Sequence, residues 1–521
     1  MKQNGGERHK IPLDRSFVLL YTIIKMAANH QKYGFTASYR GGYMIGRTYE
    51  VKELNRLYSR NRAELVAIYG RRRVGKTYLV DETFADRITF RHAGLSPADE
   101  NSHGLLKLQL DHFYNSLELH GMEKCEKPTN WLDAFLLLEK FLQSKDNGSR
   151  QVVFLDELPW LDSPKSGFIR AFEAFWNTWG CHRKNLMVIV CGSANSWIQD
   201  KLLNNHGGLY NRVTYEIKLS PFSLKECEDF YVSNNVKLSR YDIAQSYMIF
   251  GGIPYYMGYI NPEMSLAQNV DKLFFAKNAV LRDEYNRLFA SVFTNPDAVK
   301  SIVQLLYTRN SGFTRKEIVE KLKITDGGGL SRNLNALISS DFITKYVPFG
   351  YGKREEHYKL IDPFCLFYLH FVSGQKKVSE KFWQQNVTSS SISSWRGFAF
   401  ENVCFNHIEQ IKRCLGISGV ITETSAWSKK EDDTEGTQID LLIKRNDNVI
   451  NMCENKFFSD DFTVTKDYYK KILNRQTILA GHVSSKFVIH STLITTFGLT
   501  QNEYSSVFLN VILLDDLFKD E

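Results

Sequence analysis

The segment Ile68–Val80, IYGRRRVGKTYLV, constrains this chain more than any other stretch of its sequence. A continuous apolar run, Glu64–Tyr69, leads into a loop bounded by Gly70 and Gly75, and helical character follows. The loop, Gly70–Thr77, fits the pattern G-x-x-x-x-G-K-[ST], in which glycines let the backbone wrap closely around phosphate groups. A helix that begins directly after the loop adds the partial positive charge of its N-terminus. This order of strand, loop and helix predicts a nucleotide-binding α/β core.

Within this loop, the sequence predicts what each position does beside the nucleotide. Lys76 is expected to reach the β- and γ-phosphates, and Thr77 to offer its hydroxyl to Mg²⁺. Arg71 and Arg72 are expected to be solvated, whereas Arg73 is expected to contact either the nucleotide or a neighbouring domain. The expected nucleotide-binding residues of the loop and the first helical turn are Gly70, Arg73, Val74, Gly75, Lys76, Thr77 and Tyr78.

An acidic pair follows a second buried strand, Gln151–Leu155. Asp156 is expected to orient Mg²⁺ and its water, since carboxylate oxygens suit this cation. Glu157 is expected to polarise the attacking water as a general base. Two acids at the end of a strand downstream of a phosphate-binding loop therefore predict hydrolysis of ATP as well as its binding.

Two further polar positions are candidates for sensing the γ-phosphate. Ser193 follows the apolar run Leu186–Cys191, and a polar residue at the end of this strand can reach the nucleotide; Asn195 is the second candidate there. Arg212 opens the last strand of the core, Val213–Leu219. Its guanidinium suits developing phosphoryl charge, so it is expected to be an arginine finger, a γ-phosphate sensor or a surface arginine.

The bulk composition sets the number of domains and the broad class. A chain of 521 residues is too long to fold around one hydrophobic core, so it is expected to form three or four domains. Hydrophobic residues make up 43% of it, which favours ordered globular domains. None of its eight cysteines forms a C-x-x-C pair, which is typical of reduced cysteines in a cytoplasmic protein rather than of a zinc or redox site. The net charge of +8 is compatible with an anionic partner but does not indicate one.

The first residues do not fit the pattern of the core. Phe17–Ala28 is apolar and resembles the h-region of a signal peptide, but it is too short to span a membrane and contains Lys25. We expect residues 1–43 to be a leader, non-native or disordered, and expect no membrane partner. The recognisable protein begins at Met44.

After the core, the sequence pattern changes from alternating strands and helices to mostly helices. Lys300–Val347 reads as helices followed by a strand, and residues 342–360 can form a hairpin, which together predict a winged helix. In its third helix, Leu330–Ser340, Arg332 lies away from the apolar stripe and suits phosphates or base edges. The polar stretch Thr388–Ser394 is expected to be a linker to a last α/β segment.

A carboxylate pair and a lysine converge in that last segment. If Asn446–Asn448 is the turn of a hairpin, the register places Asp440 opposite Glu454, and Lys456 shares a face with Glu454. This resembles the D-(x)n-E-x-K constellation of restriction-type nucleases. The resemblance implies Mg²⁺ ligation by Asp440 and Glu454, a water-positioning role for Lys456, and a further acid at Glu401 on the preceding helix.

The ordered set of motifs resembles the archaeal-type P-loop ATPases of the AAA+/STAND group. The motifs are Ile45-Gly46-Arg47, GRRRVGKT at 70–77, LDELPW at 155–160, CGSA at 191–194 and GGIPYYM at 251–257. The resemblance implies a P-loop parallel sheet at 44–219, a helical lid at 220–299, a winged helix at 300–387 and a restriction-endonuclease-like domain at 388–521. It also implies that Gly252 and Pro254 belong to the nucleotide-binding residues, because the lid closes near the base of the nucleotide there.

Two functions remain open at this point. The first is an ATPase that couples its nucleotide state to binding or processing of DNA or RNA. The second is an ATP-dependent regulatory switch whose last domain is an inactive recognition module. ATP and Mg²⁺ are the expected ligands in both, and a homo-oligomer is compatible with both.

Overall fold

The computed structural model describes residues 44–96, 102–204, 207–293, 295–352, 355–374, 378–431 and 434–519. Residues 1–43 lie outside these ranges, so the expectation of a leader stays a prediction. Across the described ranges, no helix combines the length and apolar character needed to cross a membrane.

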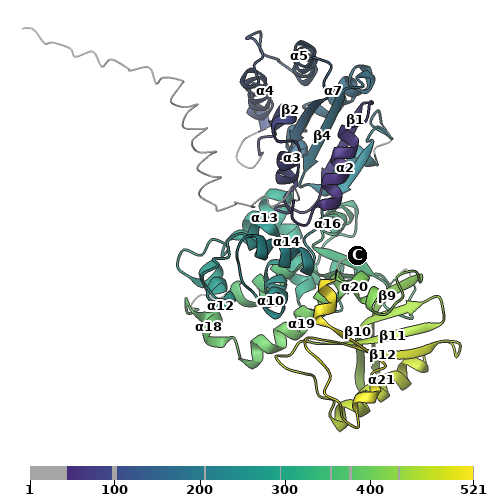
Figure 1. Cartoon of the computed structure of the whole chain (residues 1–521). Helices are drawn as coiled ribbons and strands as arrows, with labels where there is room; N and C mark the ends of the chain where they lie inside the picture. Colours follow the sequence, from purple (N-terminus) through teal and green to yellow (C-terminus); the bar gives the residue numbers. More distant parts are fainter. Residues whose placement is uncertain are drawn as a thin grey trace, which may run out of the picture.

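The N-terminal part is built on one parallel sheet of five strands in the order β2-β3-β4-β1-β5 (Figure 1). Each neighbouring pair runs parallel. The strands are β1 (Glu64–Tyr69), β2 (Ile88–Ala93), β3 (Gln151–Asp156), β4 (Leu186–Gly192) and β5 (Tyr215–Lys218). The predicted parallel α/β core is therefore confirmed.

Helices cover both faces of this sheet, which explains why its central strands are apolar throughout. Val66 and Ile68 join the core on one face, whereas Leu65 and Ala67 join a separate core on the other. One face carries α2 (Thr48–Tyr58) and α3 (Lys76–Phe84). The other carries α4 (Ser102–Leu119), α5 (Trp131–Ser144) and α7 (Phe168–Thr178).

A group of helices follows β5 and packs below the sheet in Figure 1. These are α9 (Leu224–Ser233), α10 (Arg240–Phe250), α11 (Pro254–Met257), α12 (Leu266–Val270) and α13 (Glu284–Val292). The turn before α11 touches the end of the sheet, because the Phe222 N–H donates to the Gly252 carbonyl at 2.8 Å. Gly252 has a φ of +64°, and a Cβ there would lie 2.3 Å from the Phe222 oxygen.

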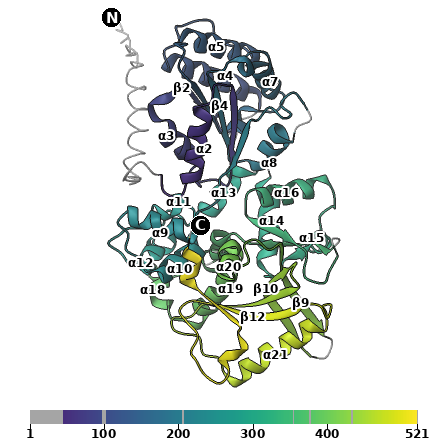
Figure 2. The same cartoon turned by 45° about the vertical axis from the view of Figure 1, so that its right-hand side comes forward.

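A small antiparallel sheet comes next, with strand order β6-β8-β7. Its elements are α14 (Pro296–Tyr307), β6 (Phe313–Thr314), α15 (Arg315–Leu322), α16 (Gly328–Ser339), β7 (Ile343–Tyr346) and β8 (His357–Leu360). Thr314 caps α15 in a capping box with Glu317. The stripe Leu330, Leu334 and Leu337 of α16 is buried, and Arg332 is exposed. Figure 2 shows α16 beneath α8 (Asn195–Ile198), a short helix after β4.

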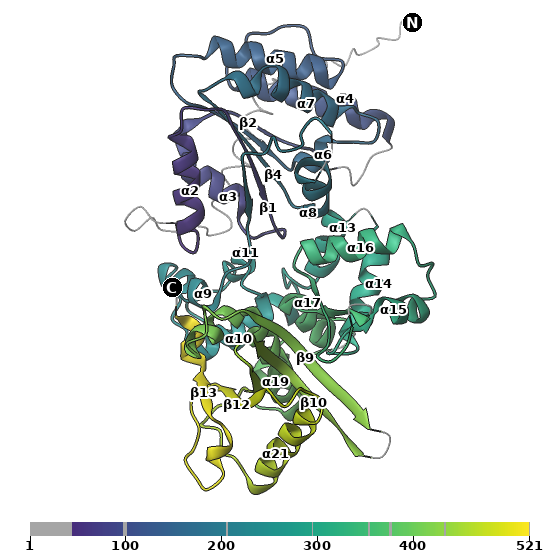
Figure 3. The same ribbon diagram turned by 90° about the vertical axis from the view of Figure 1, so that its right-hand side faces the viewer.

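The C-terminal part holds a second five-stranded sheet in the order β13-β12-β11-β10-β9. Strands β9 to β11 pair antiparallel, and β11 to β13 pair parallel. Figure 3 shows β9 and β10 as a long projecting pair. The elements are α17 (Pro363–Phe367), α18 (Phe382–Asn386), α19 (Ser390–Asn406), α20 (Ile408–Cys414), β9 (Thr422–Glu431), β10 (Thr434–Arg445), β11 (Val449–Lys456), α21 (Lys466–Ala480), β12 (Val488–Thr495) and β13 (Asn510–Leu513).

The expectation of a linker at Thr388–Ser394 is wrong. Ser389 is the N-cap of α19, and its side chain accepts a hydrogen bond from the Ile392 N–H. Serine is common in linkers, but it is also a preferred cap because its hydroxyl satisfies a free N–H of the first turn. The cap therefore leads straight into a helix whose residues Trp395 and Phe400 are buried.

One apolar cluster runs through all of these parts. It includes Val66 of the parallel sheet, Phe250 of α10, Leu334 of α16 and Ile443 of β10. The parts are therefore packed on one another rather than strung along the chain.

A substitution at Gly252 tests the contact between the α11 turn and the end of the parallel sheet. Alanine there must adopt a left-handed backbone, which costs about 1–2 kcal/mol, and its Cβ would also overlap a backbone oxygen. Gly252→Ala should therefore lower the melting temperature more than Gly350→Ala, since Gly350 has a φ of +85° but open space around its Cβ position. Equal melting temperatures for the two variants would show that the close approach is unimportant.

Candidate functional site

The loop between β1 and α3 forms a cradle of backbone N–H groups at the N-terminus of a helix. Gly70, Arg73 and Gly75 have φ values of +148°, +73° and +95°. A Cβ on Gly70 would lie 2.2 Å from the Leu219 oxygen, so only glycine fits there. The Lys76 Nζ donates to the carbonyls of Gly70 and Arg71 at 2.9 and 3.0 Å, which holds the ammonium inside the loop.

The parallel sheet brings the predicted acids to the same edge as the cradle. Strand order β3-β4-β1 places the carboxyl ends of these three strands side by side. The Thr77 hydroxyl donates to Asp156 Oδ2 at 2.7 Å, so the two oxygen groups expected to hold Mg²⁺ already touch. Among the described residues no cluster of three or more metal-binding side chains occurs.

Glu157 stands beside this pair in a constrained position. Its backbone is left-handed, with φ 45° and ψ 47°, a conformation that is unfavourable for a residue with a side chain. Its carboxylate accepts from the Ser193 N–H at 3.2 Å and from the Ser193 hydroxyl at 3.0 Å. Burial raises the pKa of Glu157, although Lys76 acts in the opposite direction. A raised pKa makes the carboxylate a better proton acceptor near neutral pH.

Ser193 and Asn195 occupy the end of β4 in different ways. Ser193 holds Glu157, so in this structure it positions the candidate base. Asn195 is fully buried; its Oδ1 accepts from the Gly70 N–H at 2.8 Å, and its Nδ2 donates to the Ser339 carbonyl at 2.8 Å. Asn195 thus connects the first residue of the cradle to the end of α16.

The expectation that Arg71 is solvated is wrong. Its side chain is 1% exposed, pairs with Asp362, and lies with its guanidinium carbon 4.7 Å from the centre of the Phe342 ring. Asp362 is 291 residues further along the chain, and it also caps α17 through the Cys365 N–H. Arg71 therefore binds the cradle to the segment between β8 and α17.

Arg73 contacts the helices after β5. Its Nε and Nη2 lie 2.8 and 2.9 Å from the two carboxylate oxygens of Glu284, and its guanidinium stacks on Tyr255 at 3.9 Å. Glu284 is 2% exposed, and burial raises its pKa although Arg73 lowers it. Of the two contacts expected for Arg73, the structure shows the one with a neighbouring part of the chain. Gly252 and Pro254 shape the turn that presents Tyr255.

Arg47 is a site residue that no chemical argument from the sequence singled out. Its Nη2 donates to the Val74 carbonyl of the cradle at 3.3 Å and to the Ser220 carbonyl at 2.8 Å. Its guanidinium also lies 4.7 Å from the Phe222 ring. Its place in the motif Ile45-Gly46-Arg47 was the available signal.

Tyr78 and Arg212, two further predicted site residues, lie differently relative to the cradle. Tyr78 is partly buried and packs against the core. Arg212 is exposed and precedes β5, at the opposite end of the sheet from the cradle. The pairing of Val66 with Tyr215 fixes this, because the strands are parallel and the cradle follows Tyr69. Arg212 therefore does not face the cradle of its own chain.

The C-terminal candidates form a compact charged cluster around Glu454. Lys456 Nζ lies 2.8 Å from Oε1, Arg475 Nη1 lies 2.5 Å from Oε2, and the Tyr468 hydroxyl also donates to this carboxylate. Burial alone would raise the pKa of Glu454, but Lys456 and Arg475 lower it below its ordinary value. The carboxylate is therefore held ionised by two cations.

Asp440 and Glu401 are the other two acids of this predicted site. Leu441 pairs with Cys453, which is the hairpin register that places Asp440 level with Glu454; the Asp440 side chain lies outside the described part. Glu401 on α19 accepts from Asn310 Nδ2 at 2.6 Å. Glu401 and Lys456 line the same cleft.

A parallel sheet with this cradle, this Thr–Asp pair and this following glutamate defines a P-loop nucleoside triphosphatase core. Residues 44–260 match the model of a family described as an ATPase domain predominantly from Archaea. This part of the chain is therefore similar to the ATPase domains of that family.

Relatives of the whole chain are distant. An uncharacterized protein of Methanocaldococcus jannaschii, MJECL04, is 25% identical over 411 residues, which cover 78% of this chain and 84% of that protein. Among solved structures, the Walker-type ATPase PABY2304 of Pyrococcus abyssi has a TM-score of 0.44 at 17% identity, covering 65% of this chain and 99% of that one. The ORC2 protein of Aeropyrum pernix has a TM-score of 0.38 at 14% identity, covering 67% and 98%.

If Glu157 is the general base, replacing it should slow ATP hydrolysis without weakening ATP binding. Glu157→Gln keeps the shape and a hydrogen bond to Ser193 but cannot accept a proton. ATP affinity should be preserved, while the hydrolysis rate falls by about 10²–10³-fold. Lys76→Ala should abolish binding instead. A Glu157→Gln protein that hydrolyses ATP at the wild-type rate would refute the assignment.

The same variant predicts a pH-dependent change in stability. Because the folded pKa of Glu157 lies above its ordinary value of 4.5, its contribution to stability is full below that value and is lost as the pH rises through the folded pKa. Glu157→Gln lacks this titration. Its melting temperature relative to wild type should therefore increase between about pH 5 and about pH 8. A constant difference across this range would contradict the raised pKa.

The buried pair of Arg71 and Asp362 predicts a rescue by double substitution. Asp362→Asn keeps the cap of α17 but leaves the guanidinium of Arg71 uncompensated, which should cost about 3–5 kcal/mol. Adding Arg71→Met removes the stranded charge, so the double variant should melt at a higher temperature than Asp362→Asn alone. If the double variant melts lower than either single variant, the pair is not the source of the loss.

Proposed function

We propose that this chain hydrolyses ATP with Mg²⁺ and uses its nucleotide state to control nucleic-acid binding by the region from residue 300 to the C-terminus. One observation carries this proposal: an ion pair and hydrogen bonds connect the cradle to that region. Arg71 pairs with Asp362, and Asn195 joins Gly70 to Ser339. A nucleotide-dependent change in the loop would therefore act on both contacts.

The chemistry of hydrolysis is assigned to residues that lie at one edge of the sheet. Lys76 and the N-terminus of α3 would bind the phosphates, Thr77 and Asp156 would hold Mg²⁺, and Glu157 would accept a proton from water. Mg²⁺ would supply charge neutralisation at the phosphates when bound. Lys76 now donates to the carbonyls of Gly70 and Arg71. A phosphate that attracts Lys76 would compete with these bonds, and Arg71 is the residue that reaches Asp362.

Residues 300–387 are the proposed winged helix of this mechanism. The order from α14 to β8, with a three-stranded antiparallel sheet, supports this interpretation. In it α16 would be the recognition helix, and its Arg332 is exposed. The same helix ends at Ser339, which Asn195 contacts. The element proposed to touch DNA or RNA is thus also an element bonded to the cradle.

Residues 388–521 are the proposed restriction-endonuclease-like domain. The succession of α19, β9, β10, β11, α21 and β12 supports this, as does the placing of Glu454 and Lys456 on β11. One observation favours the alternative of an inactive recognition module: Glu454 is already neutralised by Lys456 and Arg475. A divalent cation would have to displace at least one of these partners.

Cleavage and metal binding separate the two alternatives. With a nuclease, Mg²⁺ or Mn²⁺ should raise the melting temperature, and Glu454→Gln should remove that rise. Lys456→Ala should retain the rise but lose cleavage of a panel of DNA and RNA substrates, because lysine is not a metal ligand. These melts are best measured in the Lys76→Ala background, so that metal bound with nucleotide does not contribute. A melt unchanged by either metal, with intact substrates, would identify a recognition module.

Nucleic-acid binding is tested by its salt dependence and by Arg332. Affinity for a labelled duplex should fall steeply as salt rises, because phosphate contacts release counterions. Arg332→Ala should weaken binding, whereas Arg170→Ala, an exposed arginine on α7, should not. The affinity should also differ between ATP-loaded Glu157→Gln protein and ADP-loaded wild type. An affinity that changes with neither the salt concentration nor the bound nucleotide would count against this function.

A further inference from the structure

A cleft of about 1060 Å³ lies between the helices after β5 and the C-terminal sheet. Its walls come from α10 and the start of α12 on one side, and from α19, the segment before it and the end of β11 on the other. Lys456, the lysine of the Glu454 cluster, lies on its wall. This volume is at the upper end of what ligand pockets usually enclose.

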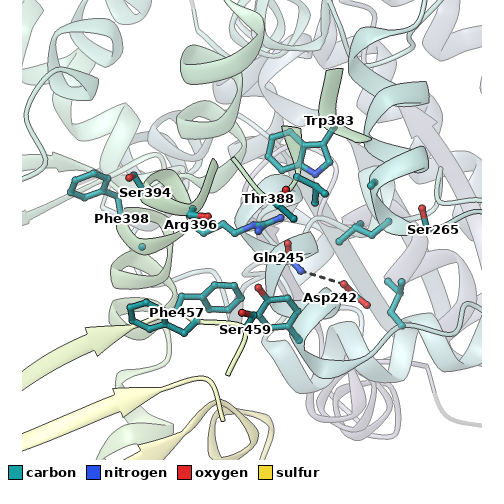
Figure 4. A pocket seen from close by; sticks show the side chains of 18 of the residues that line it. Asp242, Gln245, Ser265, Trp383, Thr388, Ser394, Arg396, Phe398, Phe457 and Ser459 are labelled. Carbon is teal, nitrogen blue, oxygen red and sulfur yellow. Dashed lines mark hydrogen bonds between the residues drawn. The ribbon is translucent and has the colours of Figure 1, made fainter. Parts of the chain in front are cut away.

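Arg396 is the unusual residue of this cleft. Figure 4 shows its side chain extending into the cleft toward Thr388 and Gln245. The residue is only 8% exposed, and its Nε is buried with no hydrogen-bond partner. No carboxylate of the described residues forms an ion pair with its guanidinium. Burial lowers the pKa of Arg396, although Tyr241 and Asp242 act in the opposite direction.

The two acids that line the cleft have hydrogen-bond partners of their own, and neither forms an ion pair with Arg396. Asp242 accepts from the Ser239 hydroxyl at 2.8 Å and from Gln245 Nε2 at 3.2 Å. Glu401 accepts from Asn310. A buried guanidinium without a counterion costs free energy, since its desolvation is not repaid by attraction. The cost is relieved when an anion enters, and a guanidinium fork matches the oxygens of a phosphate group.

We propose that this cleft seats a phosphate group of a nucleic-acid strand, with Arg396 as its principal contact and Lys456 beside it. The proposal rests on the proposed function for its choice of nucleic acid as the source of the phosphate. Two aromatic side chains on the cleft wall support that choice. Phe398 and Phe458 are 59% and 47% exposed, and bases of a single strand stack on such rings. A strand held in this way passes the Glu454–Lys456 pair.

The test compares Arg396→Met with wild type in the full chain, using a labelled single-stranded oligonucleotide. Affinity should fall about tenfold, as for loss of a charge-assisted hydrogen bond, and the salt slope should fall by about 0.7. The melting temperature should not fall, because methionine removes an unpaired buried charge. Arg396→Lys should bind with intermediate affinity, and Arg170→Met should bind like wild type. If Arg396→Met binds the oligonucleotide like wild type, the cleft does not hold a phosphate of the strand, although the proposed function stands.

A second measurement separates failure of this proposal from failure of the proposed function. Inorganic phosphate is titrated against Lys76→Ala protein, so that the cradle does not contribute, and against Lys76→Ala/Arg396→Met. If no oligonucleotide binds wild type, nucleic-acid coupling is refuted; a phosphate-dependent rise in melting temperature that needs Arg396 would then assign the seat to a free phosphorylated ligand. No rise in either protein, together with no oligonucleotide effect of Arg396→Met, would refute the seat itself.

Discussion

The buried ion pair between Arg71 and Asp362 is the interaction on which the arrangement of this molecule depends. It joins the first variable position of the phosphate cradle to a residue 291 positions later. Both side chains are almost fully buried, at 1% and 0% exposed. Separating them would leave two charges without partners in an apolar environment, and breaking such a pair typically costs several kcal/mol. The cradle and the segment after β8 are therefore held as one unit, and neither can be repositioned alone.

Two more side chains extend this unit in different directions. Arg73 reaches Glu284 and Tyr255 in the helices after β5, and Asn195 reaches Ser339 at the end of α16. Each contact starts within the cradle or is hydrogen-bonded to it. Packed contacts of this kind tend to have discrete arrangements rather than continuous ones. A change at the phosphates would therefore reach several parts together, through bonds made by the loop itself rather than through a separate relay.

The sequence predicted the local chemistry well and the long-range chemistry poorly. The cradle, the Thr77–Asp156 contact and the register opposite Glu454 follow from patterns within a strand and its adjoining loop, which obey fixed periodicities. The burial of Arg71 depends on Asp362, and no local pattern points to so distant a partner. The same limit applies to Arg396, whose isolation comes from packing between α10 and the C-terminal sheet. The cap at Ser389 was misread because serine favours linkers and helix starts alike.

The two glutamates at the centre of the candidate sites show how environment divides their roles. Burial raises the pKa of Glu157 although Lys76 and the hydrogen bonds from Ser193 lower it, so Glu157 is suited to accept a proton. Glu454 is buried too, but Lys456 and Arg475 hold it ionised, and its pKa is lowered. Glu454 is therefore a poor proton acceptor, and its negative charge is balanced by Lys456 and Arg475. Beyond this balanced cluster, Arg396 provides a cation with no carboxylate of its own. In the proposed function, the C-terminal region would bind an anion, whereas proton transfer would take place at the edge of the parallel sheet.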